Sequence, residues 1–313
     1  MEYRMENPAA AITKAASKQT YYTIRFLADR GLVDDAYRTY AYFRWVDDIL
    51  DMASESGPVP DEAERSERRA FFDRQKALLE AGYRNDIPSN VSVQEWMLVD
   101  LIRSDPDRNS GLGSYLRNMM RVMDFDVRRR GRLIAQAELD EYTRWLAVAV
   151  TEAMQYFIGH GEFAPRDGTR YLAVSAAHIA HMLRDTFVDA RDGYFNIPRE
   201  VLETHHIGPT DVRHEAYRAW VRQRVHLARE YFLAGGEYFR RSRNRRHRLA
   251  GFAYMSRFEW LLDTIAREGY VLRPRYDERK SPATGVQMIL RTLSAMLAVR
   301  NTGTSSRRIL PQR

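Results

Sequence analysis

The stretch YRTYAYFRWVDDILD, Tyr37–Asp51, joins a run of aromatic and apolar residues to three carboxylates at its end. These carboxylates are Asp47, Asp48 and Asp51. On a helix that turns about 100° per residue, all three lie on the face that carries Arg44. Like charges one turn apart repel each other, so a fold keeps them together when a cation lies over them. Mg²⁺ is such a cation, because proteins usually hold it with one or two carboxylates and the phosphates of a substrate. Taken alone, the cluster is equally consistent with a solvated helix end.

Apolar residues recur every three or four positions through most of the chain, which is the period of amphipathic helices. The segments with this pattern are 21–28, 36–50, 70–79, 139–158, 171–188, 217–239 and 250–267. Stretches rich in Gly, Pro, Asp and Ser predict the connections between them, at 54–62, 104–113, 159–168 and 205–211. None of these stretches is typical of a linker between domains. We therefore predict an all-α protein with one helical domain over residues 1–285, followed by a C-terminal helix and tail over 286–313.

The overall composition is that of a globular protein, with 313 residues, 44% of them hydrophobic and 12% aromatic. Cysteine is absent, which excludes disulfide and thiolate chemistry and favours a reducing, cytoplasmic setting. The N-terminal residues lack the pattern of a signal peptide, and no apolar run approaches the roughly 18 residues of a membrane span. We expect a cytoplasmic protein that is soluble or lies peripherally on the inner membrane face.

The formal charge is +7, and only four of the 49 basic residues are lysines. The densest basic run is RRSRNRRHR, residues 240–248. Such a run can contact an anionic surface. It lacks interleaved aromatic residues and belongs to no DNA-reading motif, so we expect no nucleic-acid partner.

A second acidic cluster lies in HIAHMLRDTFVDARDGYFNIP, residues 178–198. Asp185 and Asp189 are four positions apart, and His178 and His181 extend the same helical face. The apolar residues of this segment occupy the other side of the helix. Two helices, each with an Asp-x-x-x-Asp pair, can face each other across a cavity that holds metal ions and the diphosphate they neutralise. The second pair makes a metal–diphosphate site the better interpretation of both clusters.

From about Ser17 to Arg275 the chain resembles the squalene/phytoene synthase family, the head-to-head isoprenoid condensing enzymes. YFRWVDDILD resembles the first aspartate-rich motif of that family, and LRDTFVDARDG resembles the second. SKQTYYTIRFL resembles its N-terminal phosphate-side segment. AREYFLAG at 228–235 and FEWLLDTIAREGYVLRPR at 258–275 resemble its last two helices.

The resemblance implies a helical bundle of the isoprenoid-synthase type around a central cavity, with Mg²⁺, or alternatively Mn²⁺, as cofactor. The implied metal ligands are Asp47, Asp48, Asp51, Asp185, Asp189 and His181. The implied contacts to a prenyl diphosphate substrate are Arg44, Arg275, Tyr21, Tyr40, His178, His181 and Phe258. Catalysis would rest on Asp47, Asp51, Asp185, Asp189 and Arg44. The residues that would line the apolar wall are Tyr21, Tyr40, Trp145, Phe157, Phe187 and Phe258. Each aromatic residue is also consistent with ordinary core packing, and each histidine with a buried core histidine.

The sequence departs from the family pattern mainly around the second motif. His178 and His181 stand where the family usually has Gln and Asn, and Val188 replaces a Glu. Tyr194 replaces an Arg, and Asn196 replaces a Tyr. Two further departures are Phe43 for a common Cys and Arg144 for a frequent Tyr. The metal carboxylates are kept, whereas groups that steer the later chemistry are changed.

We therefore expect a Mg²⁺-dependent prenyltransferase that condenses two farnesyl or geranylgeranyl diphosphates head to head to a squalene- or phytoene-type product, as in isoprenoid or carotenoid biosynthesis. Two alternatives stay open. One is an enzyme that ionises a single prenyl diphosphate and cyclises, hydrates or transfers it. The other is a catalytically silent relative that acts as a scaffold. The segment 286–300 is apolar enough to contribute to peripheral membrane association, although packing on the core is also consistent with its pattern.

Overall fold

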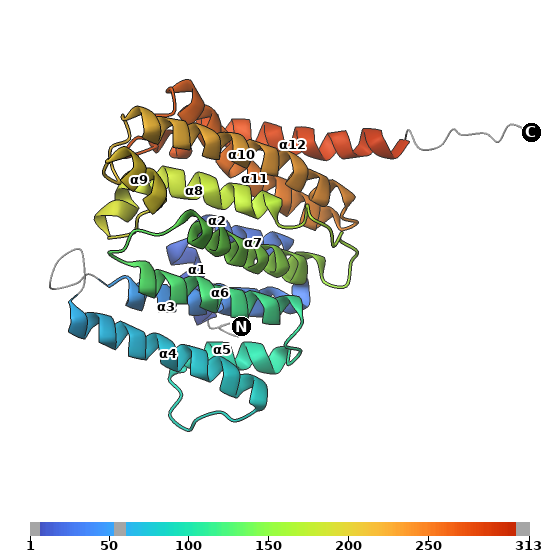
Figure 1. Cartoon of the computed structure of the whole chain (residues 1–313). Coiled ribbons are helices and arrows are strands. Elements are labelled where there is room, and N and C mark those ends of the chain that lie inside the picture. Colours follow the sequence, from blue (N-terminus) through green and yellow to red (C-terminus); the bar gives the residue numbers. More distant parts are fainter. Residues whose placement is uncertain (1–6, 53–60, 305–313) are drawn as a thin grey trace, which may run out of the picture. The chain divides into compact units, whose positions relative to one another are not determined.

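The computed structural model describes residues 7–52 and 61–304 (Figure 1). In these ranges the chain forms twelve α-helices, two short 3-10 helices and no strand, which confirms the all-α prediction. The chain divides into two compact units. Unit 1 extends to Gly161 and includes Thr186–Thr210, and unit 2 comprises Glu162–Asp185 and the chain from Asp211 onward. The predicted connection at 54–62 lies largely outside the described residues.

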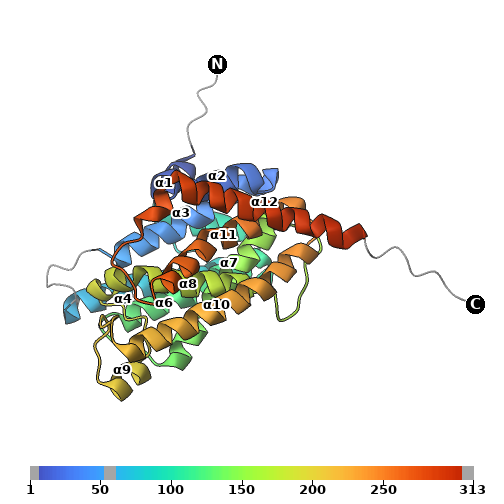
Figure 2. The same cartoon turned by 90° about the horizontal axis from the view of Figure 1, so that it is seen from above.

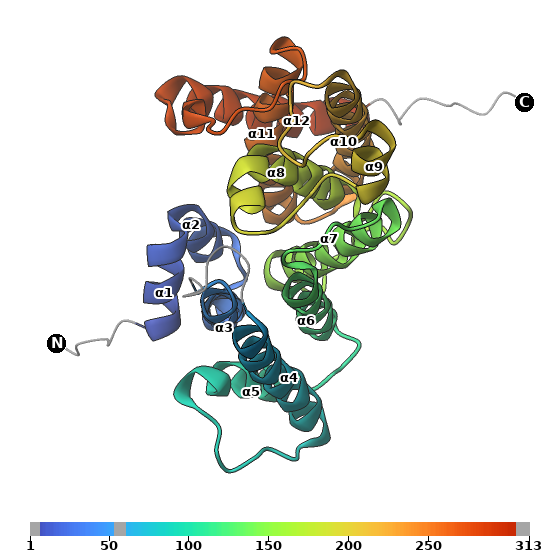
Figure 3. The same ribbon diagram turned by 60° about the vertical axis from the view of Figure 1, so that its left-hand side comes forward.

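Unit 1 contains eight whole helices among the described residues, together with the end of a ninth. They are α1 (Pro8–Ala16), α2 (Lys18–Leu27), α3 (Val33–Leu50), α4 (Glu62–Arg84), α5 (Val93–Ser104), α6 (Gly111–Arg129), α7 (Gln136–Gly159) and α9 (Arg199–His205). A 3-10 turn, Arg30–Leu32, leads into α3. Helix α3 packs on α1 and α5, and α6 packs along α7, as Figure 3 shows. Helix α3 is thus held on several sides.

The inner face of α3 is fixed by a buried polar chain as well as by apolar packing. Tyr42 and Val46 are completely buried. The Tyr42 hydroxyl donates to Gln75 Oε1 at 3.1 Å, and Gln75 Nε2 donates to Glu95 Oε1 at 3.0 Å. Because buried polar groups are costly without partners, these bonds tie α3 to α4 and α5 in one orientation. The opposite face of α3 carries the carboxylates quoted above.

Helices α5 and α6 were not predicted, and the predicted connection at 104–113 is wrong at its end, because α6 already begins at Gly111. The Ser110 side chain caps this helix by accepting the Gly113 N–H at 2.9 Å. Its buried apolar residues have helical spacing: Leu112, Tyr115, Leu116, Met120 and Met123. The glycines and serine at the start of α6 therefore mark a helix cap and not a longer loop.

Unit 2 is built on three long helices, α10 (Glu215–Arg241), α11 (Arg245–Arg267) and α12 (Pro282–Thr304), with a 3-10 turn at Asp277–Lys280. Helix α11 packs on both α10 and α12, and Figure 2 shows α12 running beside α11. Residue 286, where we place the start of the C-terminal segment, lies within α12, and the proposed domain limit there stays a prediction. No helix in the described part of the chain combines the length and the apolar character that crossing a bilayer requires.

Helix α8 (Leu172–Arg191) carries the second aspartate pair and belongs to unit 2 up to Asp185 and to unit 1 from Thr186. Within unit 2 it lies very close to α10, because a Cβ at Gly235 would stand 2.3 Å from the Ala173 nitrogen. After α8 the chain turns at Gly193, whose φ of 86° favours glycine. The Gly193 carbonyl then accepts the Gly131 N–H at 2.7 Å, which joins this turn to the end of α6.

Candidate functional site

The carboxylates of α3 lie at the C-terminal end of a helix whose other face is buried. Arg44 binds two of them, donating from Nη1 to Asp47 Oδ2 at 3.1 Å and from Nη2 to Asp48. Asp51 is the C-cap residue, and its N–H donates to the Asp47 carbonyl at 2.8 Å. The predicted shared face of Arg44 and the three carboxylates is consistent with these contacts.

Two of these carboxylates are in an environment that disfavours their charge. Burial, with the neighbouring Asp51 as the next cause, raises the pKa of Asp47 to about 7, although Arg44 acts in the opposite direction. Burial also raises the pKa of Asp51, against the hydrogen bond from Tyr194. The charge of a fourth carboxylate, Asp126, acts on both. Burial and the neighbouring carboxylates thus both disfavour the ionised form of Asp47, the form that a bound cation would stabilise.

Asp126 on α6 is a site residue that sequence reasoning missed. It accepts from Arg129 Nε at 2.6 Å and from the Tyr142 hydroxyl at 2.9 Å. Arg129 is 5% exposed. Burial alone would lower the pKa of its guanidinium, but Asp126 and other nearby groups outweigh burial, so this pKa is raised. The apolar period through α6 was the signal that could have located this carboxylate on a helix.

Tyr194, one of the departures from the family pattern, binds the first aspartate motif. Its hydroxyl donates to Asp51 Oδ1 at 3.2 Å. The guanidinium carbons of Arg129 and Arg130 lie 5.0 and 5.7 Å from the centre of its ring, within the range of cation–π contacts. Arg130 Nε also donates to the Asp192 carbonyl at 3.1 Å, which holds this loop against α6. Tyr194 thus lies against two arginines through its ring and binds Asp51 through its hydroxyl.

Asn196, a second departure, links the buried cation to the second aspartate motif. Its Nδ2 donates to Asp189 Oδ2 at 2.6 Å, and its Oδ1 accepts from Arg129 Nη1 at 2.9 Å. Asn196 is 5% exposed, so both of its amide groups are used inside the protein. In unit 1, then, Asp51, Asp126 and Asp189 belong to one polar network that centres on Arg129.

Asp185, the unit 2 member of the second motif, has the opposite environment. Burial alone would raise its pKa, but hydrogen bonds from Arg184 and His181 hold that pKa well below its ordinary range. Arg184 binds both carboxylate oxygens at 2.7 Å, and His181 Nε2 lies 2.9 Å from Oδ2. The ring of Phe258 lies 6.2 Å from that of His181. His178, which lies three residues before His181 on α8, is buried.

The other predicted substrate residues are spread over both units. In unit 1, Tyr21 stacks on Tyr37 at 5.4 Å, and burial raises the pKa of the half-buried Tyr40. In unit 2, Arg275 is exposed. Of the other aromatic residues, Phe157 is buried, and Trp145 and Phe187 are half-buried. Arg144, which departs from the family pattern, is exposed and pairs with Glu141. Their assignment to a substrate wall stays a prediction.

A metal ion fits the α3 cluster by its chemistry. Among the residues that the structure describes, no three His, Asp or Glu side chains are grouped closely enough to hold an ion by themselves. Mg²⁺ does not require three, because it is commonly held by one or two carboxylates plus phosphate oxygens and water. The raised pKa of Asp47 shows a carboxylate that a cation would stabilise. The donor set of hard oxygens suits Mg²⁺ or Mn²⁺.

The chain is similar to known proteins both in sequence and in fold. The family model for squalene/phytoene synthase matches residues 13–281. The fold is similar to that of squalene synthase HpnC from Alicyclobacillus acidocaldarius, with a TM-score of 0.66 and 19% identity, over 85% of this chain and 94% of that one. It is also similar to a dehydrosqualene synthase solved in complex with a ligand, with a TM-score of 0.65 and 15% identity, over 95% and 96% of the two chains. None of the curated proteins compared matches the chain. These structures confirm the predicted isoprenoid-synthase type of helical fold.

Proposed function

This chain belongs to the squalene/phytoene synthase family, which makes it a prenyltransferase, and on that premise we propose that it couples two farnesyl or geranylgeranyl diphosphates head to head. The proposed reaction depends on Mg²⁺ or Mn²⁺ and releases both diphosphates. The last cation gives a phytoene-type product by losing a proton, or a squalene-type product by accepting a hydride from an added nicotinamide reductant. The observation that carries the proposal is the crowded carboxylate cluster at the end of α3, where Arg44 binds Asp47 and Asp48 and the helix ends at Asp51. A helix that is anchored by buried apolar residues keeps this cluster in place.

The proposed metal ligands are Asp47, Asp48, Asp51 and Asp189 in unit 1, and Asp185 and His181 in unit 2. When bound, the metal supplies charge neutralisation at the leaving diphosphate, which favours ionisation of the allylic carbon–oxygen bond. Arg44 already shares its donors with two of these aspartates, so it can hold both the carboxylates and a phosphate oxygen. Arg275, which is exposed, is the second proposed phosphate contact.

Tyr194 and Asn196 have positioning roles in this proposal. Each donates one hydrogen bond to one oxygen of an aspartate, Asp51 or Asp189, which fixes the carboxylate and directs its other oxygen. Such outer partners of a metal site affect affinity and rate without touching the substrate. The aromatic side chains that include Tyr21, Tyr40 and Phe258 would exclude water and stabilise a carbocation by their π faces.

The changed second motif also supports a second candidate, an enzyme that ionises only one prenyl diphosphate. Tyr194 and Asn196 occupy positions where the family usually has Arg and Tyr, and both are engaged with aspartates. A site with one fewer arginine offers less neutralisation for a second diphosphate. This candidate shares the ionisation step and differs in the size of the product.

The test is to incubate the purified protein with farnesyl or geranylgeranyl diphosphate and Mg²⁺, with and without NADPH as hydride donor, and to measure both released diphosphate and the mass of the extracted product. Coupling predicts a hydrocarbon with twice the carbon number of the substrate. A product with the carbon number of the substrate would establish the single-substrate candidate. No diphosphate release with either substrate, in protein that unfolds cooperatively, would contradict both and support the silent scaffold. Chelator and the Asp47→Asn protein serve as controls.

A further inference from the structure

Three consecutive arginines lie at the end of helix α6, and their guanidinium groups have different partners. Arg128 binds Asp124 Oδ2 at 2.8 Å. Arg129 is buried and binds Asp126 Oδ1 at 2.6 Å. Arg130, the C-cap residue of α6, binds no carboxylate in the part of the chain that the structure describes. Arg130 therefore keeps a positive charge that no acidic side chain there neutralises by direct contact.

The guanidinium of Arg130 is held in place by the backbone of two neighbouring segments. Its Nε donates to the Asp192 carbonyl at 3.1 Å, and its Nη1 donates to the Leu50 carbonyl at 3.4 Å. Its central carbon lies 5.7 Å from the centre of the Tyr194 ring. An arginine has five N–H donors, so these two bonds leave three donors unused among the described residues, two of them on Nη2. The side chain is half-buried, so it is also open in part to a ligand from solvent.

Arg130 lies next to the carboxylates at the end of α3. Leu50, whose carbonyl it binds, is the last residue of α3 and directly precedes Asp51. Tyr194, against whose ring it lies, donates its hydroxyl to Asp51 Oδ1 at 3.2 Å. Burial is the main cause that raises the pKa of Asp51, and the charge of Arg130 is among the effects that oppose it. Arg130 thus supplies positive charge at the Asp51 end of the carboxylate cluster.

Arg44, at the other end of this cluster, is already shared between two carboxylates. Its Nη1 binds Asp47 and its Nη2 binds Asp48. A cation in contact with two carboxylates attracts a further anion less strongly than one without an acidic partner. Arg130 binds carbonyl oxygens, which carry only partial charges, so most of its positive charge is still available to an anionic ligand.

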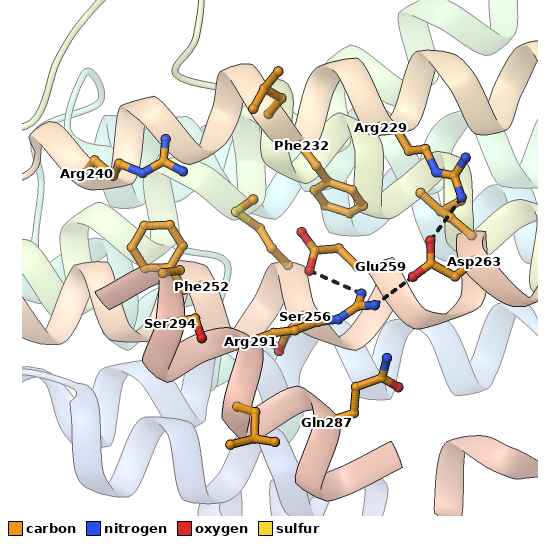
Figure 4. Close-up of a pocket in the computed structure, with 15 residues that line it drawn as sticks. Arg229, Phe232, Arg240, Phe252, Ser256, Glu259, Asp263, Gln287, Arg291 and Ser294 are labelled. Atoms are coloured by element: carbon orange, nitrogen blue, oxygen red, sulfur yellow. Dashed lines mark hydrogen bonds and ion pairs between the residues drawn. The ribbon is translucent and has the colours of Figure 1, made fainter. Parts of the chain in front are cut away.

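The groove between α10, α11 and α12 shows a different arrangement of arginines (Figure 4). It has a volume of about 590 Å³, and Arg229 and Arg291 line it. Both arginines bind Asp263, at 2.9 and 2.6 Å, and Arg291 also binds Glu259 at 3.5 Å. Cations in such pairs offer an anion little net charge. The groove is therefore a poorer anion site than the end of α6.

We propose that Arg130 binds the diphosphate group of the substrate on the Asp51 side of the α3 cluster. A guanidinium binds phosphate oxygens with several N–H groups at once, and the unused donors of Arg130 on Nη1 and Nη2 suit this contact. Arg130 is a further contact of the same site, so this assignment rests on the proposed function. Tyr194 stands where the family usually has Arg, and Arg130 supplies a guanidinium beside that position from α6. The missing arginine is thus offset from another helix, which favours a site that neutralises two diphosphates.

A purely structural role is the competing explanation for Arg130. Its two hydrogen bonds join the chain after α8 to the end of α3, so its loss could displace Asp51 or Asp189. Displaced aspartates would bind a metal ion more weakly, even without diphosphate. Loss of a phosphate contact, in contrast, weakens the binding of diphosphate and leaves the metal affinity unchanged or higher, because a positive charge beside the aspartates is removed. Metal binding and diphosphate binding must therefore be measured separately.

The experiment is isothermal titration calorimetry on the full-length protein with two titrants, Mn²⁺ alone and inorganic diphosphate in saturating Mg²⁺. Arg130→Ala should weaken diphosphate binding about 10- to 100-fold, because a charge-assisted contact is lost, without weakening Mn²⁺ binding. Arg130→Lys should lose less, because it keeps the charge but not the planar fork. Arg128→Ala, from the same helix end, is the matched control and should bind both titrants like the parent. Melting temperatures verify that the variants are folded, and Arg130→Lys carries the comparison if Arg130→Ala unfolds.

Three results would overturn the proposal. The first is diphosphate binding at the level of the parent in both Arg130 variants. The second is a loss of Mn²⁺ affinity as large as the loss of diphosphate affinity, since Arg130 would then only support the chain after α8. Both of these results leave the proposed function intact, because the parent still binds metal and diphosphate. The third, a parent that binds neither titrant, would overturn the proposed metal–diphosphate site together with the role of Arg130.

Discussion

Asp47 and Asp185 both begin an Asp-x-x-x-Asp pair on a helix, yet their electrostatic environments are opposite. Burial and the neighbouring Asp51 raise the pKa of Asp47 to about 7. Hydrogen bonds from Arg184 and His181 outweigh burial at Asp185 and hold its pKa well below its ordinary range. The motif fixes where the carboxylates lie along a helix, whereas the neighbours decide how strongly each one needs an external cation.

The remaining two aspartates of the motifs have neutral partners. Asp51 accepts from the Tyr194 hydroxyl, and Asp189 accepts from the Asn196 amide. A neutral donor orients a carboxylate without cancelling its charge, so both can still bind a cation. Of the four aspartates in the two Asp-x-x-x-Asp pairs, Asp185 binds Arg184 and His181, Asp51 and Asp189 are oriented by neutral donors, and Asp47 has one contact with Arg44, which Asp48 shares.

The largest effect is expected from removing the charge of Asp47. Asp47→Asn should lower turnover on the order of 10³-fold, because a ligand that stabilises charge in the transition state is lost. The matched control is Asp48→Asn, which removes the other carboxylate that binds Arg44. The Asp48 side chain is the more exposed of the two, at 55% against 43%, so this variant should stay within about tenfold of the parent. Diphosphate release under saturating Mg²⁺ measures both. Equal losses in the two variants would show that position within the cluster does not matter.

A smaller effect is expected at the oriented aspartates. Asn196→Ala should reduce turnover about 10- to 100-fold and raise the metal concentration needed for half-maximal activity, because Asp189 loses its donor. It should also destabilise the fold by about 1–3 kcal/mol, because the buried Arg129 loses an acceptor.

Asn196→Asp tests the donor to Asp189 separately. It keeps an acceptor for Arg129, but when ionised it cannot donate to Asp189 and repels that carboxylate. Stability at neutral pH should therefore stay below that of the parent, and the metal requirement should stay high. If both variants have the metal requirement of the parent, Asn196 is only a packing residue, and the comparison between oriented and paired aspartates fails.

The sequence predicted the fold class and both aspartate motifs because helical periodicity and i, i+4 spacing are local properties. It also placed Arg44 on the face of the α3 carboxylates, and the contacts agree with this. Roles in metal and substrate binding remain predictions.

The polar network of unit 1 could not be predicted in the same way. Tyr194 binds Asp51 across 143 positions of sequence, and Arg129 binds Asn196 across 67. No local period reports such pairs, since they depend on how helices pack. Asp126 was missed for a further reason, because the glycine and serine residues at the start of α6 were interpreted as a loop.

The smallest expected effect tests the opening comparison directly, through the stability of the metal-free protein. A carboxylate whose folded pKa is raised destabilises the fold increasingly as pH rises from its unfolded pKa, near 4, through about 7. Asp47→Asn removes this cost, so the variant should gain on the parent between pH 5 and pH 8. The gain is about 1 kcal/mol, because the Asp47 side chain is 43% exposed and solvent screens its interactions.

Asp185→Asn should have the opposite sign. A carboxylate with a depressed folded pKa stabilises the fold above its unfolded pKa, and this stability is lost only as pH falls below about 4. The variant should therefore lose about 2 kcal/mol at neutral pH and should be less stable than the parent at both pH 5 and pH 8, since Arg184 no longer binds an ionised partner. Urea unfolding in chelator at the two pH values measures both variants against the parent. A shift of the same sign in both variants would show that the two motifs are electrostatically alike. It would also contradict the view that Asp47 is the carboxylate that most needs a metal ion.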